Sequence, residues 1–259
     1  AAPSMKRSGY DVRMSAGAIT AGGCLGILIP PSVMLIVMGP VVGVPATDLF
    51  AAAVLPGLLL SGLFISWTLV RCWINPALGP ALPPEMRPAS LWPVVLDLMV
   101  GVLPVVTVIL ATLGVILAGI ATPTDAGAVG CAATFLLVVG SGRLTWPRLR
   151  RAGLATLEIS SMILLLVTSS NLFGSVFSRL GSADFLAQGL TSLALPPMMM
   201  LLVILALIFV LGWPLEWVPI VLIVVPIALP IVTAAGIDLL WFSTLVAVTL
   251  QTAWLSPPV

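Results

Sequence analysis

The sequence predicts an all-α polytopic membrane protein, and three observations lead to that fold class. Of the 259 residues, 60% are hydrophobic and only 7% are charged, whereas soluble domains carry about 25% charged residues. The mean hydropathy is +1.25, and apolar runs of about 20 residues, the length that spans a bilayer, follow one another along the chain. Prolines interrupt several of these runs, which predicts discontinuous helices.

The ends of the chain predict an internal fragment of a longer protein. The sequence starts with "AAPSMKRSGYD", without an initiator Met, and stops at "LSPPV" directly after an apolar run. No secretory signal is recognisable. We therefore expect residues 1–259 to be one transmembrane unit cut from a larger one.

The first apolar segment is predicted to be a broken helix. Residues 14–42 read as one span, but "GILIPPSVML" places Pro30 and Pro31 inside it. A proline within a helix costs about 3 kcal/mol, so two together should end it. Residues 48–73 form the second helix, and 74–90 hold five prolines and read as an aqueous loop.

Three further spans are expected in the middle of the chain. They cover 91–118 with a kink at Pro104, then 126–141, then 152–178. The turn "ATPTD" separates the first two, and the basic loop "GRLTWPRLRR" at 142–151 precedes the third. The more polar stretch at 181–193 is expected to lie along the membrane interface.

The C-terminal part predicts a re-entrant hairpin followed by a last helix at 239–256. Two short apolar arms, 196–211 and 218–233, flank the tip "GWPLEW". Neither arm has a convincing 20 residues, so a hairpin that enters and leaves by the same face fits better than two full crossings.

A pattern of turns recurs at a fixed offset of 227 residues. Pro3, Gly9-Tyr10-Asp11, Leu28 and Pro30-Pro31 correspond in order to Pro230, Gly236-Ile237-Asp238, Leu255 and Pro257-Pro258. The spacing predicts an internal repeat, and the alternative is the ordinary use of Pro and Gly as helix breakers in membrane proteins.

The basic residues predict the orientation of that repeat. With one crossing per span, nine of the ten fall on one side, which the positive-inside rule makes cytoplasmic. These nine are Lys6, Arg7, Arg13, Arg71, Arg87, Arg143, Arg148, Arg150 and Arg151. If residues 196–233 form a hairpin, Asp11 lies inside and Asp238 outside, so the repeat is inverted.

Inverted repeats with broken helices are typical of secondary transporters, whose binding sites lie near the bilayer midplane. A broken helix exposes carbonyls that coordinate Na⁺ and amides that attract anions. The polar residues beside the breaks are small: Ser32, Ser256, Thr122 and Thr124. Each hydroxyl has the alternative role of bonding back to its own helix, and Gly26 that of allowing close helix packing.

Few acidic or amide side chains lie within the spans. Asp97 and Glu158 are close enough to a cytoplasmic end to reach the interface, whereas Glu216 at the hairpin tip is the best candidate for a functional acid. Asn171 fits interhelical packing and the transport path equally well. The three cysteines, Cys24, Cys72 and Cys131, are expected to be small buried hydrophobes.

The sequence argues against an enzyme and against a nucleic-acid-binding protein. There is no histidine to act as base for a serine nucleophile, no pair of aspartates in facing spans, no phosphate-binding glycine loop and no metal-ligand spacing. No basic patch alternates with aromatic residues. A channel would need a continuous polar stripe, and a structural membrane protein has no use for paired helix breaks at mirrored positions.

Five segments carry a family resemblance: "MKRSGYD", "LGILIPPS", "DLFAAAVLPGLLL", "GIATPTDAGAVG" and "PIALPIVTAAGID". With them the chain resembles, over essentially its whole length, the large membrane subunit (M subunit, DctM-like permease) of TRAP transporters, the tripartite ATP-independent periplasmic transporters. "GWPLEWVPIVLIVVPI" and "LQTAWLSPPV" are similar to the mannitol/chloroaromatic subgroup, a label that is a weak guide to substrate.

The resemblance implies an elevator-type, Na⁺-coupled symporter of the bacterial inner membrane that takes up an organic acid and has no cofactor besides the coupling ion. Its partners would be a small membrane subunit (Q subunit) and a periplasmic substrate-binding protein. The alternative is another elevator-type anion transporter that needs no binding protein. Residues 1–42 would then end the first repeat, 43–195 would hold intervening helices, and 196–259 would form the second repeat. The hairpin of the first repeat would precede Pro3.

The resemblance also implies two Na⁺ sites. The first would use Gly26, Ile29 and Pro31, largely through backbone carbonyls. The second would use Ala253, Ser256 and Val259, with Gly119 and Thr122 possible additions; Ser32 and Glu216 would face the substrate. The chain departs from the family pattern at Ala253, where glycine is frequent, at Ser256, where threonine is frequent, and at Cys24, where a hydroxyl is common. A thiol is a poor Na⁺ ligand, so Cys24 is left out of the predicted site.

Overall fold

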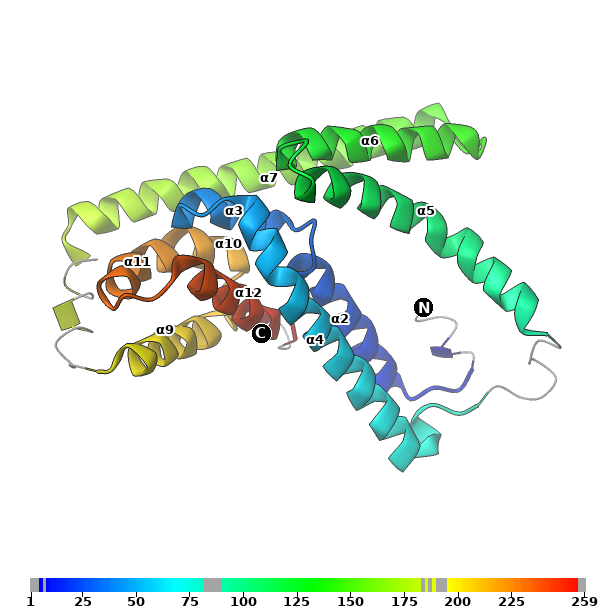
Figure 1. The fold of residues 1–259 in the computed structure, drawn as a ribbon, viewed down its shortest axis with the longest axis horizontal. Coiled ribbons are helices and arrows are strands. Elements are labelled where there is room, and N and C mark those ends of the chain that lie inside the picture. The colour runs from blue at the N-terminus through cyan, green and yellow to red at the C-terminus, as the bar shows by residue number, and fades with distance from the viewer. Residues whose placement is uncertain are drawn as a thin grey trace. The chain divides into compact units, whose positions relative to one another are not determined.

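The computed structural model describes residues 5–6, 8–81, 90–182, 185, 188–189 and 195–255. All regular secondary structure in these ranges is helical (Figure 1). Five helices are long and apolar enough to cross a membrane, and a bent pair makes a sixth candidate span. The all-helical, polytopic prediction is therefore confirmed.

The candidate spans follow the predicted order. The bent pair is α2 (Val12–Leu28) with α3 (Val33–Val42). The long helices are α4 (Ala46–Ile74), α5 (Leu91–Leu117), α6 (Pro123–Gly140), α7 (Trp146–Arg179) and a continuous run over Trp217–Ala234. Two shorter apolar helices are α9 (Pro197–Leu211) and α12 (Leu239–Leu255). The predicted break at Pro30-Pro31 is confirmed, and α5 is continuous through Pro104.

The basic loop predicted at 142–151 is wrong in its second half. Helix α7 begins at Trp146 and includes the arginines at 148, 150 and 151. Pro147 is the second residue of the helix, where its missing N–H has no partner to lose. The N–H of Leu149 donates to the carbonyl of Thr145 at 3.0 Å and closes the first turn. The loop prediction fails because Pro147 stands at a position where proline starts a helix.

The chain divides into two compact units, of which the first comprises Ala1–Pro31 and Leu55–Arg143. Helices α5 and α6 pack against each other along this unit. Gly130 of α6 is buried, and a Cβ built on it would lie 2.5 Å from Cγ2 of Thr112 in α5. The absence of a side chain at Gly130 is therefore what allows the two helices to approach closely.

The second unit comprises Ser32–Val54 and Leu144–Val259. Its core forms where α12 packs on α3 and α9, and where the run over Trp217–Ala234 packs on α3 and α7. That run consists of α10 (Trp217–Pro219), a π-helical turn (Ile220–Val224) and α11 (Val225–Ala234). Fully buried side chains include Met34, Leu35, Met38, Ile208, Val221, Phe242 and Val246.

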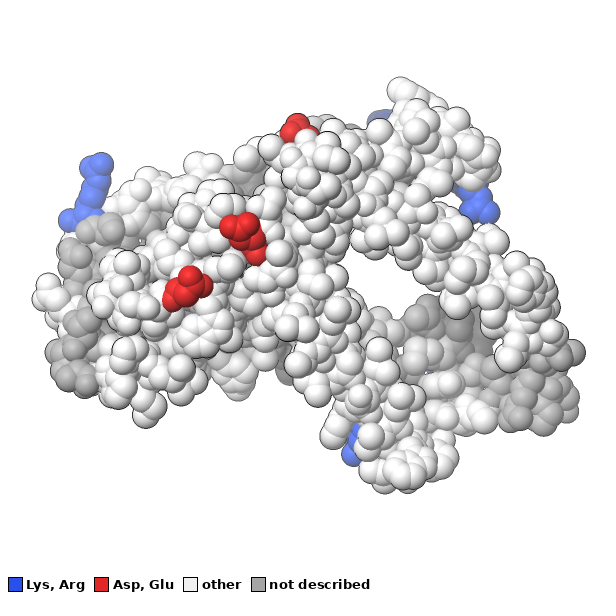
Figure 2. All heavy atoms as spheres, viewed as in Figure 1, with Lys and Arg blue, Asp and Glu red and all other residues white. Residues whose placement is uncertain are grey.

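Few charged side chains appear on the face of the molecule drawn in Figure 2.

The two arms of the predicted hairpin, α9 and the run over Trp217–Ala234, contact each other on either side of "GWPLEW". The second arm has 18 residues and passes as a span by length and composition, whereas α9 has 15. Helix length therefore does not separate a hairpin from two crossings, and the hairpin stays a prediction. Most of the stretch predicted to lie at the interface, 181–193, falls outside the described residues.

The turns that share the 227-residue offset have the same local structure. Helix α2 covers Val12–Leu28 and α12 covers Leu239–Leu255, so both helices begin and end at matching positions. Gly9 and Gly236 both have a positive φ, of 77° and 69°, a conformation that favours glycine.

Hydrogen bonds within these two turns also match. Gly9 N–H donates to the Lys6 carbonyl and Gly236 N–H to the Thr233 carbonyl, each three residues back. Asp11 Oδ1 accepts from Met14 N–H, and Asp238 Oδ1 accepts from Trp241 N–H, both at 2.8 Å. Each aspartate therefore caps the N-terminus of its 17-residue helix.

Candidate functional site

The break at Pro30-Pro31 separates a carbonyl-bearing helix end from an amide-bearing one. Ile29 caps the C-terminus of α2 in an extended conformation, and its N–H donates to the Leu25 carbonyl at 2.8 Å. Gly26 lies in the last turn of α2, where helix carbonyls have no partner further along the helix. Pro31 is exposed. Gly26 therefore lies in the last turn of α2, and Ile29 and Pro31 lie in the segment that directly follows that turn.

Ile29 is held in place by a glycine of α4. Gly57 is buried, and a Cβ built on it would lie 2.8 Å from Ile29 Cγ1 and 3.9 Å from its Cα. No amino acid with a side chain fits there without moving Ile29. The position of the Ile29 backbone at the break is therefore fixed by contact with a helix that is distant in sequence, which sequence patterns did not indicate.

Ser32 begins the second half of the broken helix. Its hydroxyl oxygen accepts a hydrogen bond from Leu35 N–H at 3.3 Å, and its side chain is 1% exposed. This is the N-cap role that serine commonly has. Ser32 directly follows the Pro-Pro pair in the sequence, and the structure gives its hydroxyl oxygen a structural function at the start of α3.

The predicted second ion site lies at the edge of the described residues. Ala253 belongs to α12, and Ser256 and Val259 fall outside the described residues. Gly119 and Thr122 belong to the first compact unit, whereas Ala253 belongs to the second. These five residues remain a prediction for the second ion site.

Thr122 has a complete set of local partners. Its hydroxyl donates to Asp125 Oδ2 at 2.6 Å and accepts from Asp125 N–H at 3.2 Å. Asp125 Oδ2 also accepts from Thr122 N–H at 3.3 Å, so the pair forms a capping box at the start of α6. Gly119, just after α5, has a positive φ of 68°. Both residues therefore serve the turn between α5 and α6.

Glu216, the acid predicted to face the substrate, and Asn171, for which packing and the transport path were equally good alternatives, are both exposed. Glu216 is the N-cap residue of α10, with no capping bond from its side chain, and lies directly before the buried Trp217. Asn171 lies on α7, and its carbonyl accepts from the Ser175 hydroxyl at 2.7 Å. These observations do not test whether Glu216 or Asn171 has a role in transport.

Sequence reasoning missed Gln251, a fully buried amide on α12. It is 1% exposed, and its Nε2 donates to the Ala247 carbonyl at 3.0 Å. Its Oε1 has no hydrogen-bond partner among the described residues. The signal was present in the sequence, because Gln251 is the residue 227 positions after Cys24 and the one amide side chain in residues 239–255.

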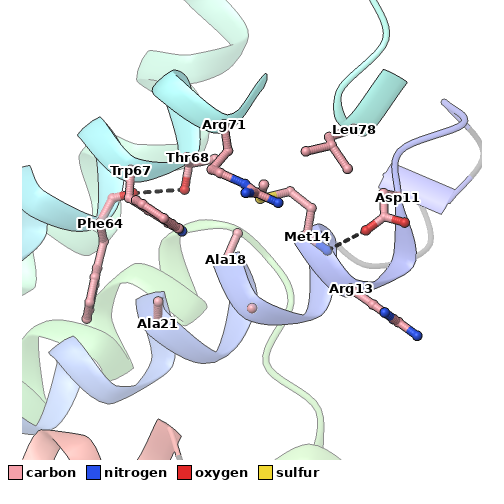
Figure 3. Close-up of a pocket in the computed structure, with 11 residues that line it drawn as sticks. Asp11, Arg13, Met14, Ala18, Ala21, Phe64, Trp67, Thr68, Arg71 and Leu78 are labelled. Atoms are coloured by element: carbon pink, nitrogen blue, oxygen red, sulfur yellow. Dashed lines mark hydrogen bonds between the residues drawn. The ribbon is translucent and has the colours of Figure 1, made fainter. Parts of the chain in front are cut away.

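A separate hollow of about 590 Å³ lies between the N-terminal half of α2 and the C-terminal half of α4 (Figure 3). Arg71 reaches from α4 toward α2, with its guanidinium carbon 5.7 Å from the centre of the Trp67 ring. Asp11 and Arg13 also line the hollow, at the end that the charge pattern predicts to be cytoplasmic. None of the predicted ion or substrate residues lines it.

The chemistry available at the break is that of neutral oxygens. Residues 24–35 contain no acidic side chain, and the described residues contain no group of three His, Cys, Asp or Glu that could hold a metal ion. Divalent cations usually require carboxylates. A set of backbone carbonyls, hydroxyls and amides suits a monovalent cation better.

Comparison with known proteins gives a consistent family. Residues 1–259 match the model of the "Tripartite ATP-independent periplasmic transporter, DctM component". A C4-dicarboxylate TRAP transporter large permease protein of Rhodobacter capsulatus is 31% identical over 99% of this chain and 60% of its own. The sialic acid TRAP transporter large permease protein of Vibrio cholerae is 29% identical over 94% of this chain and 56% of its own.

A third relative joins two subunit names in one chain. The isethionate TRAP transporter permease protein DctMQ of Oleidesulfovibrio alaskensis is 29% identical over 99% of this chain, which covers 40% of that protein. The present chain spans about 60% of the length of the large permease relatives that it matches.

Proposed function

Because the chain belongs to the DctM component family of the tripartite ATP-independent periplasmic transporters, we propose that it forms part of a large permease subunit that carries an organic anion into the cell together with Na⁺. The family is one of membrane transporters, so the chain is a multi-pass protein of the bacterial inner membrane and not an enzyme. The observation that carries the proposal is the helix broken at Pro30-Pro31, in a segment without acidic residues.

The substrate class rests on the relatives. Their names specify a C4-dicarboxylate, sialic acid and isethionate, all of which are organic anions. We extend that class to this chain and no further. The mannitol/chloroaromatic subgroup is supported only by the two sequence segments that suggested it. Ser32 and Glu216 are retained as the residues proposed to face the substrate.

Na⁺ coupling rests on the chemistry of the broken helix. The carbonyls of Gly26, Ile29 and Pro31 supply neutral oxygens at a helix end that carries partial negative charge. The second proposed site uses Ala253, Ser256 and Val259, with Gly119 and Thr122 as possible contributors. A cation bound between such half-helices needs no buried carboxylate, in keeping with a chain that has nine acidic residues in 259.

An inverted repeat is the proposed architecture behind these two sites. It is supported by the matching bounds and capping bonds of α2 and α12. It also requires Asp11 and Asp238 to lie on opposite sides of the membrane, which the distribution of basic residues and a re-entrant hairpin over residues 196–233 predict. An elevator-type movement of the ion-binding part follows from the family resemblance.

The proposed partners are a small membrane subunit and a periplasmic substrate-binding protein. The word "tripartite" in the family description and the DctMQ name of one relative support both. An elevator-type anion transporter that needs no binding protein is the alternative.

Uptake by the full-length permease, reconstituted with its small subunit into liposomes, tests the proposal. Radiolabelled organic acids are supplied with and without the binding protein, in NaCl or in choline chloride. We expect uptake only when both Na⁺ and the binding protein are present. Equal uptake in choline chloride would refute the coupling, and equal uptake without the binding protein would favour the alternative transporter class.

A further inference from the structure

Gln251 presents an acceptor atom that the described part of the chain does not use. The side chain lies in α12 and is 1% exposed. Its Nε2 donates to the Ala247 carbonyl at 3.0 Å, whereas its Oε1 has no donor within the described residues. A buried acceptor that lacks a partner costs about 1–3 kcal/mol, so a residue of this kind calls for an explanation.

The orientation of the amide follows from its one bond. Only the NH₂ group can donate to the Ala247 carbonyl, because two carbonyl oxygens facing each other would repel. The Oε1 atom is therefore the end of the amide that is left for another partner. That partner must offer positive charge or a proton donor.

The helices that pack on α12 carry no acidic side chain. Helix α12 packs against α3, α9 and α11, and none of these four helices contains Asp, Glu or His. A divalent cation would lack the carboxylates that it prefers. A monovalent cation held by neutral oxygens meets the requirements of the site.

The position of Gln251 in its helix matches that of Cys24 in α2. The two residues are 227 apart, and both lie four residues before the end of a 17-residue helix capped by a Gly-x-Asp turn. Cys24 is 3% exposed, and its Sγ donates to the Ala21 carbonyl at 3.1 Å. A thiol is a soft ligand and an amide oxygen is a hard one, so only the α12 member of this pair suits Na⁺.

We propose that Oε1 of Gln251 is a ligand of a co-transported Na⁺ at the C-terminal end of α12. The inference rests on the proposed Na⁺ coupling and adds an amide side chain, a ligand type that the predicted sites lack. The two proposed Na⁺ sites then differ in their ligands, because the position equivalent to Gln251 in the first repeat is Cys24.

The test measures Na⁺ binding directly on the full-length permease in detergent. Thermal unfolding is followed as NaCl replaces choline chloride at constant ionic strength, because a ligand that binds the folded state raises Tm with its concentration. The variants are Gln251→Leu, which removes both polar atoms, and Gln251→Glu, which keeps an oxygen. The matched control is Ser243→Ala, on the same helix and 0% exposed, whose hydroxyl already donates to the Leu239 carbonyl at 2.7 Å.

We expect Gln251→Leu to raise the half-saturating Na⁺ concentration at least about tenfold. Its Tm in choline chloride should be equal to or above that of the natural protein, because an unsatisfied buried acceptor has been removed. Gln251→Glu should retain Na⁺-dependent stabilisation, and Ser243→Ala should leave the half-saturating concentration unchanged.

Two results would overturn the inference about Gln251 while leaving the proposed function intact. An unchanged half-saturating concentration in Gln251→Leu, with a lower Tm in choline chloride, makes Gln251 a packing residue. A half-saturating concentration raised equally in Ser243→Ala makes the effect a general one of α12. If the natural protein shows neither Na⁺-dependent Tm nor Na⁺-dependent uptake, the coupling itself is refuted and the inference with it.

Discussion

The contact between Gly57 and Ile29 gives the sharpest prediction about the helix break. In Gly57→Ala, the new Cβ would lie 2.8 Å from Ile29 Cγ1, whereas ordinary contact begins at 3.4 Å. Either Ile29 or α4 must therefore move by about 0.6 Å. Overpacking of this kind costs about 1–3 kcal/mol, and it displaces the residue whose carbonyl is proposed to bind Na⁺.

A second glycine of the same helix provides the control. Gly62 of α4 is exposed, and a Cβ built on it would have nothing within 4 Å. Replacing a helical glycine by alanine contributes up to about 1 kcal/mol of helix stability. Gly62→Ala should therefore be neutral or stabilising, and Gly57→Ala should be about 1–3 kcal/mol less stable than Gly62→Ala.

The assay is reversible unfolding of the full-length permease in mixed detergent and SDS, followed by helical circular dichroism. The double variant Gly57→Ala/Ile29→Ala removes the atom that clashes and keeps the Ile29 backbone carbonyl. We expect a favourable coupling energy of about 1 kcal/mol or more between the two sites, since residues in contact are not additive. Additivity of the two substitutions, or equal stability of Gly57→Ala and Gly62→Ala, would refute the reasoning.

Three further predictions follow from local contacts. Thr122→Ala should lower stability by about 1 kcal/mol through loss of the cap on α6 and leave the half-saturating Na⁺ concentration unchanged in the Tm titration. A shift there would show that the Thr122 hydroxyl binds the ion. Gly130→Ala should lower Tm because its Cβ would lie 2.5 Å from Thr112 Cγ2, and Thr112→Ser should recover most of the loss; no recovery would place the effect elsewhere. A cysteine introduced at Asp238 should react with a membrane-impermeant thiol reagent from the periplasm, whereas reaction only from the cytoplasm would make the repeat parallel.

Much of the fold could be predicted because membrane helices depend on local sequence. Length and apolarity located α4 and α5 to within a few residues, and the Pro-Pro pair located the break between α2 and α3. The start of α7 was missed, because Pro147 stops a helix in its interior but begins one in its first turn. The same residue type therefore predicts opposite structures according to its position.

The candidate site was less accessible to sequence reasoning. Ser32 could be placed beside the break, but its role as N-cap depends on which backbone N–H lies within reach. Gly57 looked like any other glycine of an apolar helix until the structure placed Ile29 against it. Such contacts join residues far apart in the sequence, and no periodicity within one helix encodes them.

The two segments that share the 227-residue offset agree in some features and differ in others. The Gly-x-Asp turns agree in φ and in their hydrogen bonds, because a positive φ and an N-cap tolerate few residue types. The equivalent buried positions carry different side chains, Cys24 and Gln251. The turns therefore support the proposed repeat, whereas the chemistry of the two segments has to be examined residue by residue.

The absence of acidic residues from the broken helix has an electrical consequence. Neither 12–42 nor 239–259 contains Asp or Glu, so a cation bound there keeps its full positive charge, with no carboxylate to cancel it. A membrane potential of 100 mV changes the free energy of moving each such charge across the membrane by about 2.3 kcal/mol. A permease that moves more sodium ions than anionic charges on its substrate would then draw on the membrane voltage as well as on the Na⁺ gradient, and its uptake would produce a measurable inward current.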